Sequence, residues 1–362
     1  MQGERRRDVC QCQASATNIG RDLSGDRLLL WPPMMHTATK LADIAQELSL
    51  ETAWGEGRSW LTVHFPEQPG LQAFLRVALE RLTEEELDST QALVGTAASP
   101  LATEIPSIKP LRRLAAALES IWFEELLANG QLTCAFQPIV NASDRRIAGY
   151  EALLRARRPD GTILSAAVLL RAARALDRIT ALDVRARILA LEQAKKHELD
   201  GLLFINFTPS AIYDPTTCLQ TTWAAAERLR IDPGKVVFEV IESESLTNLR
   251  HAADVLAAYR QRGFRVALDD IGSAHSGLVW LSALQPDFVK IDRQLTAGLA
   301  ADVAKRAIVA KLAELCRQIG ARTIAEGLED EADASVAVEL GVDFLQGYLF
   351  GHPQILEEVS DS

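Results

Sequence analysis

Beyond Gly130, short apolar runs alternate with long amphipathic segments, and this alternation restricts the possible folds more than any other feature of the chain. The runs have the length and composition of buried strands, and the segments carry apolar residues at helical spacing. Helices are predicted at Ala166–Ala175, Ala181–His197, Leu249–Arg262 and Val303–Ile319. Strands and helices in this order indicate a mainly parallel sheet covered by helices, which is either a doubly wound open sheet or a (β/α)8 TIM-like barrel.

Acidic or amide side chains follow several of the predicted strands. These side chains are Glu151, Asn206, Glu239, Asp269, Asp270 and Glu326. The strands before them are Ile147–Tyr150, Leu202–Ile205, Val236–Phe238, Phe264–Leu268 and Thr323–Ala325. A carboxylate at the end of a buried strand is costly unless it is solvated, paired or bound to a cation, and carboxylate and amide oxygens suit Mg²⁺ or Mn²⁺. A metal site gathered from so many strands favours the barrel, because an open sheet binds its ligand at one switch point.

Composition indicates an ordinary globular protein. The chain has 362 residues, of which 48% are hydrophobic and 24% charged, and its formal net charge is −11. This balance argues against a surface that coats DNA, RNA or an anionic membrane. No apolar stretch has the length of a membrane span. Five scattered cysteines without zinc spacing fit a reducing compartment better than a disulfide framework. We therefore expect a cytoplasmic protein without a nucleic-acid or membrane partner.

The chain is expected to fall into four parts. They are a disordered tail (1–34), a small α/β module (35–95), a linker with a connecting helix (96–130) and the barrel (131–357). In the module, Thr83 and Glu86 predict a capping box that opens a helix over Glu84–Val94. The connecting helix is predicted over Leu111–Asn129, where Gly130 ends it. No motif of the module identifies the signal that it would sense, so a regulatory or dimerising role is a hypothesis.

Motifs spread over about residues 131–355 follow the order of one known family. They are Phe136–Val140, Glu151-Ala152-Leu153-Leu154-Arg155, Phe204–Pro209, Phe238–Ser243, Asp269–Gly272, Pro286–Asp292, Ala325–Glu329 and Gln346–Tyr348. On these segments the chain resembles the EAL-domain family, phosphodiesterases that open cyclic di-GMP. A Glu-Ala-Leu triplet alone carries little weight, because it occurs often by chance. The specificity comes from the ordered set.

The resemblance implies a centre with two divalent ions, Mg²⁺ or Mn²⁺. One ion would be held by Glu151, Asn206, Glu239 and Asp269, and the second by Asp269, Asp270 and Glu326. Two such ions clamp the attacking and leaving oxygens of a phosphoryl displacement and lower the pKa of a bound water. Lys290 corresponds to a lysine that orients this water, and Glu329 and Gln346 correspond to groups that hold Lys290 and the metal waters. Catalytic roles are therefore expected for Lys290, Glu329 and Glu151.

The resemblance also implies substrate contacts, a loop anchor and a homodimer formed through the EAL domain. Substrate contacts are expected from Gln137, Leu153, Arg155, Asp292, Gln346 and Pro353. The planar guanidinium of Arg155 suits a phosphate, and Glu242 corresponds to the glutamate that anchors the loop after Asp270. In that loop, Ala274 and His275 replace a glycine and an aromatic residue of the family pattern, and alanine lacks the conformational freedom of glycine. Every proposed ligand is intact, so we expect activity.

Each of these residues has a plainer interpretation on its own. A strand-end glutamate usually pairs with a basic residue, Asp269-Asp270 suggests a helix-capping turn, and Lys290 suggests a surface residue. For the whole set, hydrolysis of cyclic di-GMP to linear pGpG is the favoured function. The alternative is a receptor that binds the dinucleotide without cleaving it. An enolase- or aldolase-type barrel with Lys290 as base explains Asn206 and the Asp pair less well.

Overall fold

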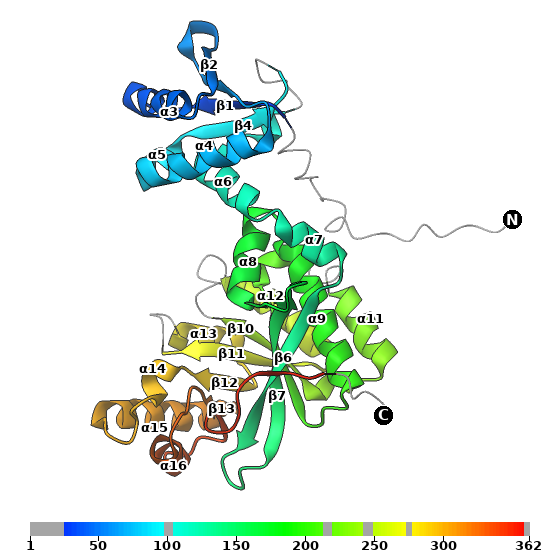
Figure 1. The fold of residues 1–362 in the computed structure, drawn as a ribbon. Helices are drawn as coiled ribbons and strands as arrows, with labels where there is room; N and C mark the ends of the chain where they lie inside the picture. The colour runs from blue at the N-terminus through cyan, green and yellow to red at the C-terminus, as the bar shows by residue number, and fades with distance from the viewer. Residues whose placement is uncertain (1–24, 98–103, 213–218, 242–248, 273–276, 358–362) are drawn as a thin grey trace, which may run out of the picture. The chain divides into compact units, whose positions relative to one another are not determined.

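The computed structural model describes residues 25–97, 104–212, 219–241, 249–272 and 277–357. The chain divides into two compact units (Figure 1). The first comprises residues 1–130 and 167–179, and the second comprises residues 131–166 and 180–362. Helix α8 (Ala166–Ala175) has the predicted bounds, but all of it except Ala166 belongs to the first unit, whereas we expected it in the barrel. None of the helices among the described residues is long and apolar enough to cross a membrane.

An antiparallel five-stranded sheet forms the centre of the first unit, in the order β2-β3-β1-β4-β5. The strands are β1 (Arg27–Trp31), β2 (Glu51–Trp54), β3 (Leu61–His64), β4 (Gln91–Gly95) and β5 (Lys109–Pro110). The helices are α3 (Met35–Glu47), α4 (Gln68–Arg81), α5 (Glu84–Ser89), α6 (Leu111–Glu119) and α7 (Trp122–Ala128), with short 3₁₀ turns at Glu56–Arg58 and Ile105–Ser107. The sequence β1-α3-β2-β3-α4-β4 is that of a split βαβ arrangement, so a small α/β module is present as predicted.

The predicted tail of residues 1–34 is wrong for its last part. Strand β1 lies in the middle of the sheet, and its three leucines, Leu28, Leu29 and Leu30, are buried. Because both neighbouring strands and packing on both faces cover this short run, it needs no alternation of apolar and polar residues. Residues 1–24 lie outside the described residues.

Two predicted helices of the first unit are also interrupted. The capping box between Thr83 and Glu86 forms, but the helix that it opens ends at Ser89, and the following residues pair with β1 as strand β4. Sheet pairing therefore overrides the helical spacing of that segment. The predicted helix Leu111–Asn129 breaks at Ser120, whose hydroxyl donates to the carbonyl of Ala116 at 2.7 Å.

Eight strands close into a barrel in the second unit, which confirms the predicted barrel (Figure 1). They are β6 (Leu132–Asn141), β7 (Ile147–Arg157), β9 (Leu202–Asn206), β10 (Val236–Ile241), β11 (Arg265–Ile271), β12 (Phe288–Ile291), β13 (Arg322–Ala325) and β14 (Phe344–Gln346). The ring runs β6-β14-β13-β12-β11-β10-β9-β7 and closes where β7 pairs with β6. Strand β6 is antiparallel to both neighbours, whereas the other pairs of the ring are parallel. A short turn joins β6 to β7, and only antiparallel strands can be joined in this way.

The remaining elements of the second unit connect or extend these strands. The helices are α9 (Ile179–Lys196), α11 (Gln220–Leu229), α12 (Leu249–Gln261), α13 (Gly277–Leu284), α14 (Arg293–Thr296), α15 (Val303–Gln318) and α16 (Glu331–Glu339). Strands β8 (Ile163–Ser165) and β15 (Gln354–Ile355) lie beside β7 and β6, and 3₁₀ turns occur at Pro209–Ala211 and Pro233–Lys235. Each long helix buries one face, as α12 does with Val255, Leu256 and Tyr259, which is the pattern that the sequence predicted.

One apolar layer is built from nearly every strand of the barrel. It consists of Ile139, Phe204, Val237, Ala267, Phe288, Ile324 and Phe344, all of them buried. The rings of Phe204 and Phe288 meet edge to face with centroids 5.2 Å apart, a favourable aromatic arrangement. Because side chains alternate along a strand, the residue two positions further on faces the same way. The apolar layer therefore determines where the next layer of side chains lies.

Candidate active site

The candidate site is the layer of side chains that follows this apolar layer. Two positions further along six of the seven parallel strands stand Asn206, Glu239, Asp269, Lys290, Glu326 and Gln346. On β6, which runs the other way, the residue two positions before Ile139 is Gln137, and its register partner on β7 is Glu151. The structure thus brings together the predicted side chains from all five predicted strands. Glu151 and Glu239 lie inside their strands, not at the ends where we expected them, because β7 and β10 continue past them.

Lys290 lies among four carboxylates and is only 1% exposed. Its Nζ is 2.7 Å from Glu326 Oε1 and 3.2 Å from Glu239 Oε1. It is also 3.3 Å from Glu151 Oε2 and 3.3 Å from Asp269 Oδ1. A buried ammonium is costly without such partners. One lysine does not balance four carboxylates, however, so the cluster has an excess of negative charge.

Burial and mutual repulsion raise the pKa values of several of these carboxyl groups. Burial raises the pKa of Glu239 well above 4.5, and Glu151 and Asp269 add repulsion that Lys290 only partly offsets. Burial likewise raises the pKa of Glu326 well above 4.5 and raises the pKa of Asp269. For Asp270, burial and the adjacent Asp269 raise the pKa to about 6. These groups therefore ionise together only if more positive charge is supplied.

Asp269 and Asp270 both belong to the site because β11 is bulged between them and β12. Neighbouring residues of a regular strand point to opposite faces. Here the pairing with β12 shifts between Leu268 and Ile271, and Asp270 has a left-handed φ of 60°. Aspartate tolerates this conformation better than most residues, and a bulge re-aims the side chains beside it. The Asp pair is therefore a bulge within a strand, not the helix-capping turn that was the plainer interpretation.

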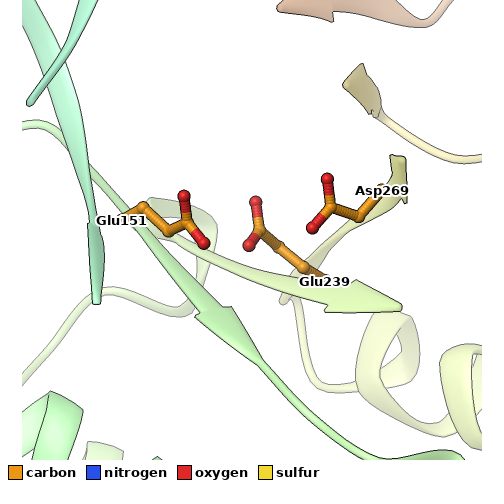
Figure 2. A group of neighbouring side chains, drawn as sticks. All are labelled: Glu151, Glu239 and Asp269. Atoms are coloured by element: carbon orange, nitrogen blue, oxygen red, sulfur yellow. The ribbon is translucent and has the colours of Figure 1, made fainter. Parts of the chain in front are cut away.

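Two overlapping carboxylate groups have the spacing of metal sites. They are Glu151, Glu239 and Asp269, and then Asp269, Asp270 and Glu326, each with one oxygen per residue within 4.8 Å of the others. Figure 2 shows the first group, whose three carboxylates approach one another from neighbouring parts of the barrel. Asp269 belongs to both groups.

Glu239 provides an independent test of whether these residues fit a divalent cation. Its side chain is fully buried, yet neither carboxylate oxygen has a hydrogen-bond partner among the described residues. The approach of Lys290 at 3.2 Å is an ion pair without hydrogen-bond geometry. Buried polar atoms without partners are rare in native structures, and an all-oxygen ligand set suits a hard cation. The residues present therefore fit divalent ions at this centre.

Glu151 is held by amide side chains from two other strands. The amide of Asn206 donates to Oε1 at 2.9 Å, and the amide of Gln346 donates to Oε2 at 2.7 Å. Gln346 also donates to Gln137 at 3.3 Å, and Gln137 donates to the carbonyl of Gly351 at 3.2 Å. Although burial opposes ionisation, Lys290 and these amides lower the pKa of Glu151. Glu151 is thus kept ionised and fixed in orientation.

A cavity of about 250 Å³ opens beside this centre. Its lining residues are Gln137, Glu151, Asp292, Arg293, Glu326, Gly327, Glu329, Gln346, Gly347 and Tyr348. Arg293 and Tyr348 were not predicted as site residues, although Arg293 directly follows Lys290-Ile291-Asp292 and Tyr348 ends the Gln346-Gly347-Tyr348 motif. Proximity to a motif residue was the only signal that sequence offered for them.

The remaining predicted residues that the structure describes are not among the four carboxylates around Lys290. Glu329, which we expected beside Lys290, is paired with Arg293 at 2.9 Å. Leu153 and Arg155 follow Glu151 along β7, and the Arg155 guanidinium donates to the carbonyl of Leu154 at 2.8 Å. Leu153, Arg155 and the half-buried Pro353 are not among the described residues that line the cavity. Glu242, Ala274 and His275 lie outside the described residues.

Fold and site together define a class: an eight-stranded barrel whose strands carry an oxygen-rich, lysine-containing centre on top of an apolar layer. The chain belongs to the EAL domain family, whose model matches residues 121–353. Curated relatives include the cyclic di-GMP phosphodiesterase PdeB of Shewanella oneidensis, 29% identical over 237 residues. The probable cyclic di-GMP phosphodiesterase PdeG of Escherichia coli is 29% identical over 232 residues. These alignments cover 64% and 62% of this chain but only 28% and 45% of the relatives, so the chain spans less than half their length.

Solved structures of EAL proteins resemble the fold. A standalone EAL protein of Vibrio cholerae O395 in its c-di-GMP-bound form is 32% identical, with a TM-score of 0.54 over 64% of this chain and 98% of that chain. The PaMucR phosphodiesterase in complex with c-di-GMP is 27% identical, with a TM-score of 0.58 over 64% of this chain and 95% of that chain. BlrP1 of Klebsiella pneumoniae, at 21% identity and a TM-score of 0.57, shows the fold alone, but that likeness covers 91% of this chain.

Proposed function

We propose that this protein is a metal-dependent phosphodiesterase that hydrolyses one 3′–5′ bond of cyclic di-GMP to give linear pGpG. The observation that carries the proposal is the pair of carboxylate groups that share Asp269 around Lys290. Two of the relatives are named as definite or probable cyclic di-GMP phosphodiesterases, and two solved neighbours hold the dinucleotide. These names support cyclic di-GMP as the substrate.

The donor set supports two divalent ions, Mg²⁺ or Mn²⁺, held as the family resemblance implies. One ion would take Glu151, Asn206, Glu239 and Asp269, and the other would take Asp269, Asp270 and Glu326. When bound, such ions supply Lewis acidity, neutralise the phosphodiester and lower the pKa of a bound water. Their charge would also meet the excess of negative charge that the cluster has with Lys290 alone.

The chain's own residues supply position and charge for this reaction. Attack of water on phosphorus forms one P–O bond, breaks the bond to the 3′ oxygen, and leaves a 5′-phosphate and a 3′-hydroxyl. Lys290 stays protonated, because its carboxylate neighbours outweigh burial and raise its pKa well above 10.5. An ammonium at this place suits the orientation of a nucleophilic hydroxide. Although burial opposes ionisation, Lys290, Gln346 and Asn206 lower the pKa of Glu151 and keep it ionised. Asp292 and Glu329 border the cavity where the substrate would lie.

The direct test is product analysis with the full-length protein. Cyclic di-GMP is incubated with Mg²⁺ or Mn²⁺, and the nucleotides are separated by chromatography. We expect pGpG from the wild type and a rate lower by about 10²–10³-fold from Lys290→Met, because removal of one preorganised charge or donor has effects of this size. Lys311→Met, which removes an exposed lysine, serves as the control. Retained binding of cyclic di-GMP without product under either metal would instead establish a receptor.

We propose in addition that the protein acts in the cytoplasm as a homodimer formed through the EAL domain, and that residues 35–95 regulate it. The family resemblance supports the dimer, and the presence of a separate folded unit supports the regulatory role. Light scattering after size-exclusion chromatography measures the mass of the assembly. A monomer at micromolar concentration would refute the dimer.

A further inference from the structure

Arg293 brings a positive charge to a cavity that is otherwise acidic. Among the described residues that line the cavity, Arg293 is the only one with a cationic side chain, and the acidic ones are Glu151, Asp292, Glu326 and Glu329. The side chain of Arg293 is 62% exposed. It is therefore accessible to a molecule that enters the cavity.

The backbone around Arg293 lies against the ends of two other strands, β11 and β13. The backbone N–H of Asp292 donates to the carbonyl of Ile271 at 3.1 Å, and its side chain caps α14 by accepting from the N–H of Gln294 at 2.9 Å. Gly327, with a φ of 64°, lies directly against the arginine stem. A Cβ at Gly327 would come within 2.7 Å of Cβ and Cγ of Arg293. The glycine thus allows the stem to cross the edge of the cavity.

The guanidinium of Arg293 is held by an ion pair that is easy to exchange. Its Nη2 lies 2.9 Å from Oε1 of Glu329, whose side chain is 49% exposed. Exposed ion pairs contribute little to stability, so a better anionic partner can replace Glu329. This pairing also accounts for the difference from the sequence prediction, in which Glu329 was expected beside Lys290.

A cyclic dinucleotide carries two phosphodiester anions, and one cleavage event uses only one of them. The acidic centre with its cations would hold the reacting phosphodiester, whereas the second one needs a positive partner in the adjoining cavity. We infer that Arg293 is a substrate-binding residue, which leaves Glu329 and binds the phosphodiester that is not being cleaved. The planar donor fork of arginine matches a phosphate in two places at once. The exchange releases the Glu329 carboxylate within the cavity. This inference rests on the proposed function.

The test compares substrates with two phosphodiesters and with one. Steady-state kinetics of Arg293→Ala are measured with cyclic di-GMP and with bis(p-nitrophenyl) phosphate, each with Mn²⁺. We expect KM for cyclic di-GMP to rise about tenfold or more, as for loss of a charge-assisted hydrogen bond, with kcat changed by less than about twofold. KM for the single diester should stay at the wild-type value, and Arg293→Lys should recover part of the affinity.

Arg228→Ala is the matched control. Arg228 has a similar exposure of 59% and an ion pair of the same length, 2.9 Å, with Glu192, but it does not line the cavity. Its KM for cyclic di-GMP should equal that of the wild type. An unchanged KM in Arg293→Ala, or an equal rise for both substrates, overturns the inference while the wild-type activity stands. A wild type that neither cleaves nor binds cyclic di-GMP overturns the proposed function and this inference together.

Discussion

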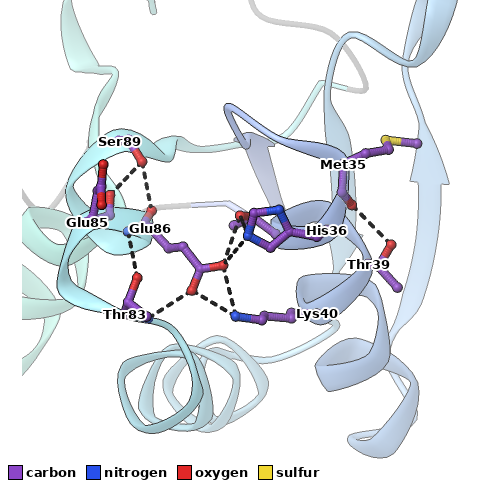
Figure 3. Close-up of polar contacts among 9 residues, drawn as sticks. Met35, His36, Thr39, Lys40, Thr83, Glu85, Glu86 and Ser89 are labelled. Atoms are coloured by element: carbon purple, nitrogen blue, oxygen red, sulfur yellow. Dashed lines mark hydrogen bonds and ion pairs between the residues drawn. The ribbon is translucent and has the colours of Figure 1, made fainter.

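The protein contains two clusters in which buried carboxylates lie beside a lysine. They differ in whether the carboxylate oxygens have hydrogen-bond partners. In the first unit, Glu86 accepts hydrogen bonds from Lys40 and the N–H of Thr83 at 2.9 Å (Figure 3). The hydroxyl of Thr37 also donates to Glu86, at 3.0 Å. These bonds, the Thr83 N–H first, lower the pKa of Glu86 to about 2. Every oxygen of that carboxylate has a partner, so the cluster is complete without a ligand.

The barrel centre is not complete in this sense. Four carboxylates share the single ammonium of Lys290, and both oxygens of Glu239 lack a hydrogen-bond partner among the described residues. Burial raises the pKa of Glu239 there, whereas hydrogen bonds lower that of Glu86. A satisfied buried carboxylate stabilises a fold, and an unsatisfied group of them indicates a site that binds cations. The two clusters should therefore respond to substitution in opposite ways.

The largest expected effect is on activity at the barrel centre. Asp269→Asn removes the carboxylate that both groups share. We expect turnover of cyclic di-GMP to fall by about 10³-fold, because preorganised charge of this kind contributes that much to catalysis. Glu86→Gln should leave turnover within about twofold of the wild type. Rates of pGpG formation measure both, and an Asp269→Asn variant as active as Glu86→Gln would remove the distinction between the clusters.

A smaller effect on activity is expected one contact away from the proposed metal ligands. Gln346→Leu removes the amide that donates to Glu151 at 2.7 Å. Groups that orient a metal ligand are commonly worth about 10–100-fold in metal affinity or activity. The concentration of Mn²⁺ needed for half-maximal rate should rise by that factor. An unchanged metal requirement would mean that Glu151 is positioned without Gln346.

Stability should change in the reverse direction from activity. Glu239→Gln removes a buried acid that has no hydrogen-bond partner among the described residues. The metal-free variant should therefore melt about 2–4 °C higher than the wild type, the shift expected for about 1 kcal/mol in a unit of this size. Thermal unfolding in EDTA measures this shift. Added Mn²⁺ should raise the melting temperature of the wild type and have less effect on the variant. A variant that melts several degrees lower in EDTA would show that Glu239 stabilises the barrel itself.

The smallest effect is expected at Glu86, and it depends on pH. Because the folded-state pKa of Glu86 lies below its ordinary value of 4.5, its contribution to stability is present above about pH 4.5 and is lost as the pH falls toward 2. Glu86→Gln should destabilise the first unit by about 1 kcal/mol at pH 6, the usual net value of one hydrogen bond, and by less at pH 3. Hydrogen exchange in peptides from α3 and α5, compared with the wild type at each pH, measures the difference.

Glu47→Gln is the matched control for this prediction. Glu47 also belongs to the first unit, and its hydrogen bond with Arg81 also lowers its pKa, but the pair is exposed. Screening by water makes such pairs weak, so exchange in α3 should hardly change. Equal effects of the two substitutions at pH 6 would contradict the importance of burial at Glu86.

Much of the barrel could be predicted because its sequence signals are local. Apolar runs identify the strands, and residues two positions further on share their direction, so the positions of Asn206, Glu239 and Glu326 follow from Phe204, Val237 and Ile324. The bulge at Asp270 and the antiparallel strand β6 were not predicted, because both depend on pairing with distant strands. Arg293 was missed for a similar reason: its position depends on Gly327, which is far away in sequence.

The first unit was predicted less well, although it contains the more regular sheet. Strand β1 has only three leucines, between Arg27 and Trp31, and β4 continues the apolar spacing of a preceding helix. Both are strands because they pair with each other in the interior of the same sheet. Short segments of this kind have no periodicity of their own, so tertiary pairing decides their conformation.

The most direct test of the central claim is a crystal structure of the wild type soaked with Mn²⁺, with anomalous diffraction used to locate the metal. We propose that the polar layer of the barrel binds two cations through the two carboxylate groups to which Asp269 belongs. Two anomalous peaks are then expected, one among Glu151, Glu239 and Asp269 and the other among Asp269, Asp270 and Glu326. Absence of both peaks at a saturating concentration of Mn²⁺, or a single peak that does not contact Asp269, would contradict this proposal.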